Sequence, residues 1–495
     1  MSAFASEAVR DALTRAGLLV GVRGPLPERL TMITDDSRQV VPGSLFVAVR
    51  GTTRDGHDFL PAVADRAAAA VVEDASRTQL PALVVTDARR AAPVAAAAAY
   101  GEPARALRLI GVTGTNGKTT TVGVLRHLLD EGTGGRSASI GTLGVLVGSE
   151  GTPSPGGGGL TTPGPIELQR VLRALADAGV TTVAMEVSSH SLHQRRVDGL
   201  RFAAAVFTNL TRDHLDYHGT MDAYVAAKAR LLDYLRDDGA AVINADDRAW
   251  QVLARAPHQV RFSLADADAD VRATDVRYTA RGSEWTLEAG GARADVRLPL
   301  VGDFNVANAL GAAAAAWTLG VPADTIAARL TSLPQVPGRL ERIHDHPTVL
   351  RDYAHTPDAL ERALLAVRPF AARRLLVVFG CGGDRDRGKR PQMGAIAERL
   401  TDHAIVTSDN PRTEDPDRII DDIVAGMHGT NHERITDRRD AIARALAIAA
   451  GDDVIVLAGK GHETYQIRGT TSYPFDERAI VRELVAESPM RLPSA

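Results

Sequence analysis

The chain has 495 residues, with a hydrophobic fraction of 44% and a charged fraction of 24%, values typical of a globular protein with several domains. Its 57 basic and 61 acidic residues nearly balance, so nothing indicates a nucleic-acid or membrane surface, and no run of about 18 apolar residues predicts a membrane span. The single cysteine, Cys381, excludes an intramolecular disulfide, and the N-terminus lacks the apolar core of a signal peptide, so we expect a cytoplasmic enzyme.

Residues 1–106 have the pattern of an α/β domain. Short apolar runs at 44–49, 67–72 and 82–85 are separated by polar turns and alanine-rich helical stretches. Apolar runs of this length favour buried strands. The Gly-Glu-Pro sequence at 101–103 favours a turn and predicts a domain boundary.

The segment Thr-Gly-Thr-Asn-Gly-Lys-Thr-Thr at 113–120 is the most informative motif. It follows a strand-like run at 107–112 and precedes a helix-like run at 121–129. A glycine-rich turn in this position directs backbone N–H groups and the positive end of the helix dipole at one point. Lys118 adds a cation and Thr119 a hydroxyl that can bind Mg²⁺. The segment therefore predicts a triphosphate-binding loop.

The loop departs from the standard phosphate-binding pattern at one position. Val112 stands where the pattern G-x-x-x-x-G-K-[ST] has its first glycine. A glycine turn beside a surface lysine is the alternative interpretation, but the flanking strand and helix favour phosphate binding.

The rest of the central segment predicts a parallel sheet. Strand-like runs at 181–185, 202–207 and 240–243 alternate with amphipathic stretches at 165–178 and 221–236, which we interpret as crossover helices. Residues 151–159 are rich in Gly, Pro and Ser and are expected to form a flexible surface loop.

A Pro/Gly cluster at 333–338 predicts a second domain boundary. Buried-strand runs follow at 375–379, 404–407 and 454–458, and each ends in a polar or glycine-rich loop. Ligands of open α/β sheets bind at the carboxyl ends of the strands, so these loops are candidate binding elements.

Three polar features of the central segment could carry chemistry. Glu186, at a strand end, is either a Mg²⁺ ligand or an exposed loop glutamate. Residues 209–218 place two histidines and two aspartates within six positions, which suits a metal, a reacting phosphate or a hydrogen-bonded polar turn.

Lys228 lies in a helix-like stretch, where lysines are ordinarily solvated. Burial in a nucleotide site would lower its basicity, and the neutral amine could then add carbon dioxide to form an anionic carbamate.

The loops at 380–390, 408–412 and 459–463 follow the three strands of the last segment. Each alone is compatible with a simple turn, because Asn-Pro and Gly-Gly are turn sequences. Together they place arginines, carboxylates and an amide at one edge of a sheet. This combination suits a zwitterionic ligand, with arginines binding its carboxylates and Asp or Glu its ammonium groups.

The chain resembles the Mur ligase family in motifs that extend over nearly its full length. They lie at 36–38, 43–48, 113–120, 186–190, 213–218, 352–357 and 459–463. The family adds amino acids to the UDP-linked peptidoglycan precursor in the bacterial cytoplasm. The resemblance implies an α/β protein of three domains. These are an N-terminal UDP-substrate-binding domain at 1–106, a central P-loop-type parallel-sheet ATPase at 107–337 and a C-terminal Rossmann-like amino-acid-binding domain at 338–495.

The resemblance also implies roles for individual residues. ATP is expected to contact Gly114, Thr115, Asn116, Gly117, Lys118, Thr119, Thr120, Asn305, Arg339, Asp352 and His355. The UDP-linked substrate is expected to contact Asp35, Ser37, Thr52, Thr53, Arg54, Thr161, Thr162, Ser188, Gln194 and Arg196. The amino-acid pocket is expected to contain Arg385, Asp409, Asn410, Pro411, Arg412, Gly459 and Glu463. The implied Mg²⁺ ligands are Thr119, Glu186, His214 and the carbamate of Lys228.

The Asp-Asn-Pro-Arg sequence at 409–412 resembles the motif of those family members that add meso-2,6-diaminopimelate. The implied reaction is acyl-phosphate ligation. ATP phosphorylates the D-glutamate γ-carboxylate of UDP-N-acetylmuramoyl-L-alanyl-D-glutamate, and the diaminopimelate amine then displaces phosphate. Lys118, Glu186, His214 and Lys228 are the expected catalytic residues, with Mg²⁺ as cofactor and ATP as co-substrate.

Other activities remain open at the level of sequence. The nearest alternative is a ligase that adds L-lysine. Arg412 favours diaminopimelate over lysine, because a guanidinium can bind the distal carboxylate that only diaminopimelate has. A folylpolyglutamate-synthase-like ligase is expected to carry Gly-Lys-Gly-Ser where this chain has Gly-Lys-Thr-Thr at 117–120. A P-loop kinase or GTPase would need a lid or a guanine-reading motif that the sequence does not show.

Overall fold

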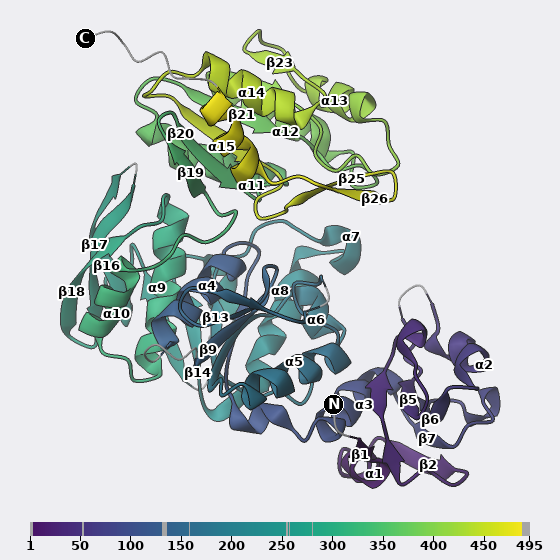
Figure 1. Ribbon diagram of the computed structural model, residues 1–495. Coiled ribbons are helices and arrows are strands. Elements are labelled where there is room, and N and C mark those ends of the chain that lie inside the picture. Colours follow the sequence, from purple (N-terminus) through teal and green to yellow (C-terminus); the bar gives the residue numbers. More distant parts are fainter. Residues whose placement is uncertain are drawn as a thin grey trace. The chain divides into compact units, whose positions relative to one another are not determined.

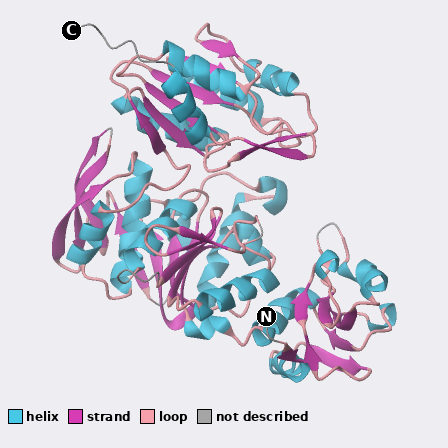
Figure 2. Ribbon diagram, in the orientation of Figure 1, coloured by secondary structure: helices cyan, strands magenta, loops and turns pink. Residues whose placement is uncertain are grey.

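The computed structural model describes residues 3–51, 54–130, 136–157, 159–253, 256, 258–279 and 281–487. The chain forms two compact units. The first consists of Met1–Arg272, Ala289–Ala292 and Asn308–Ile326, and the second of Ala273–Glu288, Arg293–Ala307 and Ala327–Ala495. Helices and strands alternate along the chain, as Figures 1 and 2 show, and the predicted α/β class is confirmed.

The first unit begins with a sheet of order β2-β7-β6-β5-β4, which is parallel except for the β2–β7 pair. Alternate residues of its central strands point to two apolar cores. Leu45 and Val71 pack with α1 and α3, whereas Phe46 and Val72 pack with α2. The elements are β1 (Phe4–Ala5), α1 (Ser6–Arg15), β2 (Leu19–Arg23), β3 (Arg29–Leu30), β4 (Met32–Thr34), β5 (Ser44–Val47), α2 (Leu60–Val63), β6 (Ala67–Val72), β7 (Ala82–Val85) and α3 (Ala88–Ala99).

The first unit also contains eight neighbouring strands of an eleven-stranded sheet, in the order β11-β10-β9-β12-β8-β13-β14-β15. The strands from β9 to β15 are parallel, and β10 and β11 add an antiparallel edge. The strands are β8 (Arg108–Thr113), β9 (Ser137–Gly141), β10 (Gly144–Val147), β11 (Thr152–Ser154), β12 (Thr182–Glu186), β13 (Phe202–Phe207), β14 (Leu235–Asn244) and β15 (Gln259–Ser263).

Strand β8 is central to this sheet, because Val112 pairs with Glu186 of β12 on one side and with Val206 of β13 on the other. The carboxyl ends of three adjacent strands therefore converge, which is where open α/β sheets bind ligands. The helices of this part are α4 (Lys118–Leu129), α5 (Pro165–Asp177), α6 (Ser189–His193), α7 (Leu215–His218) and α8 (Met221–Ala229).

Two expectations for this region are wrong in part. The predicted helix at 221–236 ends earlier, since α8 stops at Ala229, a 3-10 turn follows and β14 begins at Leu235. Leu235 pairs with Phe202 of β13, so tertiary strand pairing ends the helical segment. The predicted loop at 151–159 contains strand β11, which pairs with β10. Pro153 is compatible with a strand here because β11 lies at the sheet edge.

The second unit contains a six-stranded sheet of order β19-β20-β24-β21-β22-β23, which is parallel except for the β19–β20 hairpin. Helices α11, α12 and α13 cover one face, and α14 and α15 cover the other. These elements are β19 (Glu341–Asp345), β20 (Thr348–Asp352), α11 (Pro357–Val367), β21 (Leu375–Phe379), α12 (Lys389–Leu400), β22 (His403–Val406), α13 (Pro416–Val424), β23 (His432–Arg434), α14 (Arg438–Ile448), β24 (Val454–Ala458) and α15 (Glu477–Glu487).

A hairpin of β25 (Tyr465–Arg468) and β26 (Thr471–Pro474) follows β24 and its loop. The remaining elements are β16 (Val271–Thr279), β17 (Gly282–Ala289), β18 (Ala292–Leu298), α9 (Asp303–Thr318) and α10 (Ala323–Thr331), and each of them contains residues of both units. Within the part of the chain that the structure describes, no helix is both long enough and apolar enough to cross a membrane.

Candidate functional site

The phosphate loop lies between β8 and α4, as predicted, and its two glycines are required by geometry. Gly114 and Gly117 have φ values of 152° and 83°, which residues with a side chain rarely adopt. A Cβ atom on Gly114 would lie 1.9 Å from Oγ1 of Thr208, and one on Gly117 would lie 2.1 Å from Oδ1 of Asn308. Val112 belongs to the buried strand β8, so the missing first glycine falls in the strand rather than in the turn.

Two lysines converge on one carbonyl oxygen of this loop. Lys118 Nζ donates to the oxygens of Gly114 at 3.0 Å and Thr115 at 2.8 Å, and Lys228 Nζ donates to Gly114 O at 2.7 Å. Lys228 is only 1% exposed, and its Nζ lies 4.5 Å from the ring centre of Tyr224. Burial, followed by the nearby Lys118, lowers the pKa of Lys228 well below its ordinary value. The expectation that a helix lysine is solvated therefore does not apply to Lys228.

Glu186 ends strand β12 and is buried. Its carboxylate accepts hydrogen bonds from Thr142 N at 2.8 Å and Thr142 Oγ1 at 3.3 Å. A Cβ atom on Gly141 would lie 2.2 Å from Oε1 of Glu186, so the β9 strand end leaves room for this carboxylate. The alternative of an exposed loop glutamate is wrong, and the carboxylate lies at the strand end beside the phosphate-loop strand.

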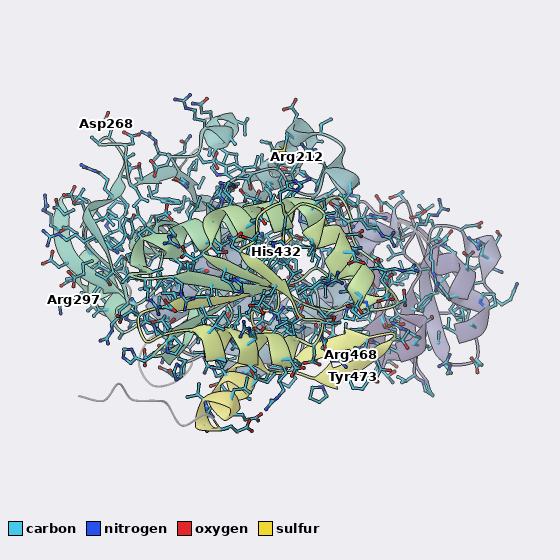
Figure 3. The ribbon with its side chains drawn as sticks, turned by 90° about the horizontal axis from the view of Figure 1, so that it is seen from above. Arg212, Asp268, Arg297, His432, Arg468 and Tyr473 are labelled. Carbon is cyan, nitrogen blue, oxygen red and sulfur yellow. The ribbon has the colours of Figure 1, made fainter. Side chains whose placement is uncertain are left out.

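The histidines predicted at 209–218 form a compact aromatic group with α6. The His190 ring lies 4.8 Å from that of His214 and 4.2 Å from that of Tyr217, measured between ring centres. Burial lowers the pKa of His214, and burial with the neighbouring His214 and His218 lowers that of His190 to about 4. The group therefore presents neutral imidazoles, which is the form that binds metals. Arg212, labelled in Figure 3, precedes this group.

A magnesium site built from the predicted ligands would be one of mixed donors. In the described ranges, no three His, Cys, Asp or Glu side chains are arranged to hold a metal. A site here would thus need the other donor types that were predicted, the Thr119 hydroxyl and an anionic Lys228 beside Glu186 and His214. Two amines that share the Gly114 carbonyl favour such an anion, because a carbamate on Lys228 removes the repulsion between them.

Four of the residues predicted to contact the UDP-linked substrate form one hydrogen-bonded network. Arg196 donates to Gln194 Oε1 at 2.6 Å and to Thr162 O at 2.9 Å. Thr162 Oγ1 accepts from Ser188 N at 3.1 Å and donates to Glu186 O at 2.9 Å. The network therefore connects these residues directly to the strand end that carries Glu186.

The other predicted substrate contacts are more dispersed. Thr161 Oγ1 lies 3.4 Å from Thr142 Oγ1, close to the same network. Asp35 and Ser37 flank Asp36, which caps a 3-10 helix at Ser37–Gln39, and Arg54 O accepts from Gly51 N at 2.8 Å. Thr52 and Thr53 lie outside the described residues.

The remaining predicted ATP contacts belong to the second unit. Asn305 is fully buried and donates through Nδ2 to Val301 O at 2.8 Å. The Arg339 guanidinium lies 4.9 Å from the ring centre of Tyr353. His355 Nδ1 lies 2.8 Å from Tyr353 O, at the end of β20. Asp352 accepts from Leu340 N at 2.7 Å and Ala354 N at 2.8 Å, and burial raises its pKa.

The three predicted amino-acid-binding loops come together at the carboxyl ends of β21, β22 and β24. Asn410 Nδ2 donates to Glu463 Oε2 at 2.9 Å. A Cβ atom on Gly459 would lie 2.6 Å from Asp409 Oδ2, so this position needs glycine. Arg412 has a φ of 52° and donates to Gly383 O at 2.8 Å, next to Pro411. Arg385 and Arg412 both lie close to Gly382, whose Cβ would meet them at 3.7 and 2.9 Å.

Lys460 was not among the predicted site residues, although it lies in the predicted binding loop at 459–463. Lys460 is fully buried, and its Nζ donates to Asn410 Oδ1 at 3.0 Å. A lysine between two glycines gave no signal of burial. Tyr224 was also not predicted; it precedes Lys228 by one helical turn, and its hydroxyl lies 3.1 Å from Thr115 Oγ1.

Three family models match the chain. The model described as Mur ligase middle domain matches residues 112–316, the one described as Mur ligase, glutamate ligase domain matches 338–461, and the one described as Mur ligase family, catalytic domain matches 29–105.

Similar proteins cover nearly the full length. The UDP-N-acetylmuramoyl-L-alanyl-D-glutamate–2,6-diaminopimelate ligases of Synechococcus elongatus and Geobacillus kaustophilus are each 47% identical to the chain. The alignments cover 92% and 91% of this chain, respectively, and 94% of each relative. A solved structure of a ligase with this same name is 34% identical, with a TM-score of 0.67, and the match covers 94% of this chain and 97% of that one.

Proposed function

Since the chain belongs to the Mur ligase family, we propose that it is the ATP-dependent ligase that joins meso-2,6-diaminopimelate to UDP-N-acetylmuramoyl-L-alanyl-D-glutamate. The new amide forms at the D-glutamate γ-carboxylate through an acyl phosphate, in the synthesis of peptidoglycan precursors. The cytoplasm, where these soluble nucleotide substrates are found, is the proposed location.

The observation that carries the proposal is the convergence of Lys118 and Lys228 on the Gly114 carbonyl. A carboxylate is a poor electrophile, so the reaction needs a phosphoryl group to create a leaving group. Backbone N–H groups of the loop and the Lys118 ammonium would neutralise the charge on the transferred phosphoryl group. Bound Mg²⁺ would add to that neutralisation, held by Thr119, Glu186, His214 and the carbamate of Lys228.

The loops of the second unit would bind the incoming amino acid. Arg385 and Arg412 can bind carboxylates, and Asp409 and Glu463 can bind ammonium groups. Diaminopimelate has an ammonium and a carboxylate at its distal centre, whereas L-lysine has only an ammonium there. A pocket that contains both kinds of partner therefore favours diaminopimelate.

The test measures phosphate release from ATP in the presence of UDP-N-acetylmuramoyl-L-alanyl-D-glutamate, with meso-2,6-diaminopimelate or L-lysine as the acceptor. We expect turnover with diaminopimelate and much slower turnover with lysine. Faster turnover with lysine would show that the acceptor is wrong. No release with either amino acid would contradict the ligase assignment itself.

A further inference from the structure

The chain uses lysine very sparingly. Only four of its 57 basic residues are lysines: Lys118, Lys228, Lys389 and Lys460. Lys118 and Lys228 belong to the phosphate-loop site, and Lys389 Nζ donates to His355 O at 2.6 Å, beside the predicted ATP contacts. Arginine supplies nearly all other positive charge, and a lysine differs from it by carrying a compact amine that a planar guanidinium does not replace. Lys460 is the one fully buried lysine among the described residues to which the proposed function gives no role.

Lys460 is fully buried at the end of β24, and its ammonium is surrounded by oxygen atoms. Its Nζ lies 3.0 Å from Asn410 Oδ1, 3.4 Å from Glu463 Oε2 and 3.6 Å from Asp409 Oδ1. The rings of Tyr465 and Phe475 lie 5.9 Å from the same nitrogen. A buried ammonium with three acceptors and flanking rings is held in one place.

Lys460 helps to fix the orientation of the Asn410 amide. Oδ1 of Asn410 accepts from Lys460 Nζ and from Ile467 N at 2.9 Å, and both of these groups can only donate. The Nδ2 group must therefore face Glu463, to which it donates at 2.9 Å. Ile467 belongs to strand β25, so the hairpin that carries Arg468 and Tyr473, both labelled in Figure 3, takes part in this arrangement.

The formal charges of Lys460, Asp409 and Glu463 determine which ligand charge the cluster can accept. Lys460 contributes one positive charge among the two carboxylates of Asp409 and Glu463. One negative charge is left without a partner inside the cluster, which matches a single ammonium group of a ligand. Without Lys460 the cluster would carry two such charges, and it would attract a second cation or repel a nearby ligand carboxylate.

On this basis we propose that Lys460 is a positioning and specificity residue of the amino-acid pocket. It holds Asn410, Asp409 and Glu463 in place and limits the pocket to one uncompensated negative charge. The pocket then accepts an amino acid whose distal centre has both an ammonium and a carboxylate, and it disfavours one whose distal end is an ammonium alone. This inference rests on the proposed ligase function.

The test compares Lys460→Met with Arg438→Met as a matched control. Arg438 is also a fully buried cation; it pairs with Glu477 and donates to Ala458 O at 2.9 Å, two residues before Lys460. Steady-state phosphate release gives kcat and KM for meso-2,6-diaminopimelate, L-lysine and ATP in each variant. For Lys460→Met we expect the diaminopimelate KM to rise roughly tenfold or more, the scale of a lost charged hydrogen bond, with the ATP KM nearly unchanged.

The decisive quantity is the ratio of kcat/KM for diaminopimelate to that for lysine. It should fall in Lys460→Met and stay at the wild-type value in Arg438→Met, whatever stability the control loses. A ratio that is unchanged in Lys460→Met would overturn the proposal, as would an equal fall in both variants. If the wild-type protein releases phosphate with neither amino acid, the result contradicts the proposed ligase function itself, and the inference about Lys460 fails with it.

A second variant, Lys460→Gln, keeps the proposal testable if Lys460→Met does not fold. Lys460→Gln removes the charge and keeps a hydrogen-bond donor in a shorter side chain. We expect its ratio to fall as well, because the cluster again has two uncompensated carboxylates. If Lys460→Met and Lys460→Gln both fail to fold while Arg438→Met folds, Lys460 serves the fold and the proposal is wrong.

Discussion

The shared carbonyl of Gly114 sets the chemistry of Lys228. Two ammonium groups on one acceptor repel each other, and the fully enclosed one is the easier to neutralise. A neutral amine in contact with dissolved carbon dioxide forms a carbamate, which would turn a repulsive pair into an attractive one.

This predicts a measurable modification of Lys228. Protein equilibrated with ¹³C-labelled bicarbonate should show one slowly exchanging carbamate signal in its ¹³C spectrum. The signal should be absent from Lys228→Met, and phosphate release by this variant should fall by about 100-fold or more, the scale of a lost catalytic electrostatic group. A carbamate signal that persists in Lys228→Met would place the modification elsewhere.

Arg412 gives a second prediction at the residue scale. Arg412→Ala removes the guanidinium that lies beside Gly382 and Gly383, so the KM for diaminopimelate should rise about tenfold or more while that for ATP changes little. Arg468→Ala is the matched control, since Arg468 pairs with Arg412 through the backbone and has a half-exposed side chain. Similar losses in the two variants, or an equal rise in the ATP KM, would mean that Arg412 supports the fold.

The sequence indicated residue types better than residue environments. The phosphate loop was predictable because glycines, a lysine and a threonine at fixed spacing have few other uses. The buried state of Lys228 and of Glu186 was not, since both depend on strands and helices that are distant in the chain. Lys460 was overlooked for the same reason, as its partners Asp409 and Asn410 come from another loop.

At the scale of the element, the turn between β8 and α4 is fixed by close contacts as well as by φ. Gly117→Ala should destabilise the protein by about 1–3 kcal/mol and should weaken ATP binding, because the new Cβ would collide with Asn308. Thermal unfolding and nucleotide-binding calorimetry measure the two effects.

Gly179→Ala is the control that distinguishes backbone strain at a positive φ from a steric collision of the new Cβ atom. Gly179 follows α5 with a φ of 78°, close to that of Gly117, but nothing lies within 4 Å of its added Cβ. This variant should lose less stability than Gly117→Ala and should bind ATP normally. Equal effects of the two substitutions would mean that backbone conformation alone accounts for the loss.

Element boundaries were predictable where apolar runs coincide with strands, as in β6, β13, β21 and β24. They were wrong where pairing with a distant strand decides the outcome. Leu235 leaves the helical pattern because it pairs with Phe202, and Thr152–Ser154 becomes a strand because β10 offers an edge. Composition indicates a flexible loop in the second case, but it contains no information about a neighbouring edge.

At the scale of the whole molecule, each unit has apolar cores of its own. Calorimetry should therefore resolve more than one unfolding transition. Leu364→Ala, in the α11 core of the second unit, should cost about 2–5 kcal/mol and lower one transition. Leu172→Ala, in the α5 core of the first unit, should lower a different one. A single transition that both variants shift alike would show that the chain unfolds as one cooperative unit.

The scarcity of lysine also determines how the protein can be handled chemically. Lys228 and Lys460 are buried, so reagents that acylate side-chain amines can reach only Lys118 and Lys389, which are partly buried and hydrogen-bonded to backbone carbonyls. Among side-chain amines, cross-linkers, dyes and coupling resins would therefore react either very little or at the ligand-binding loops.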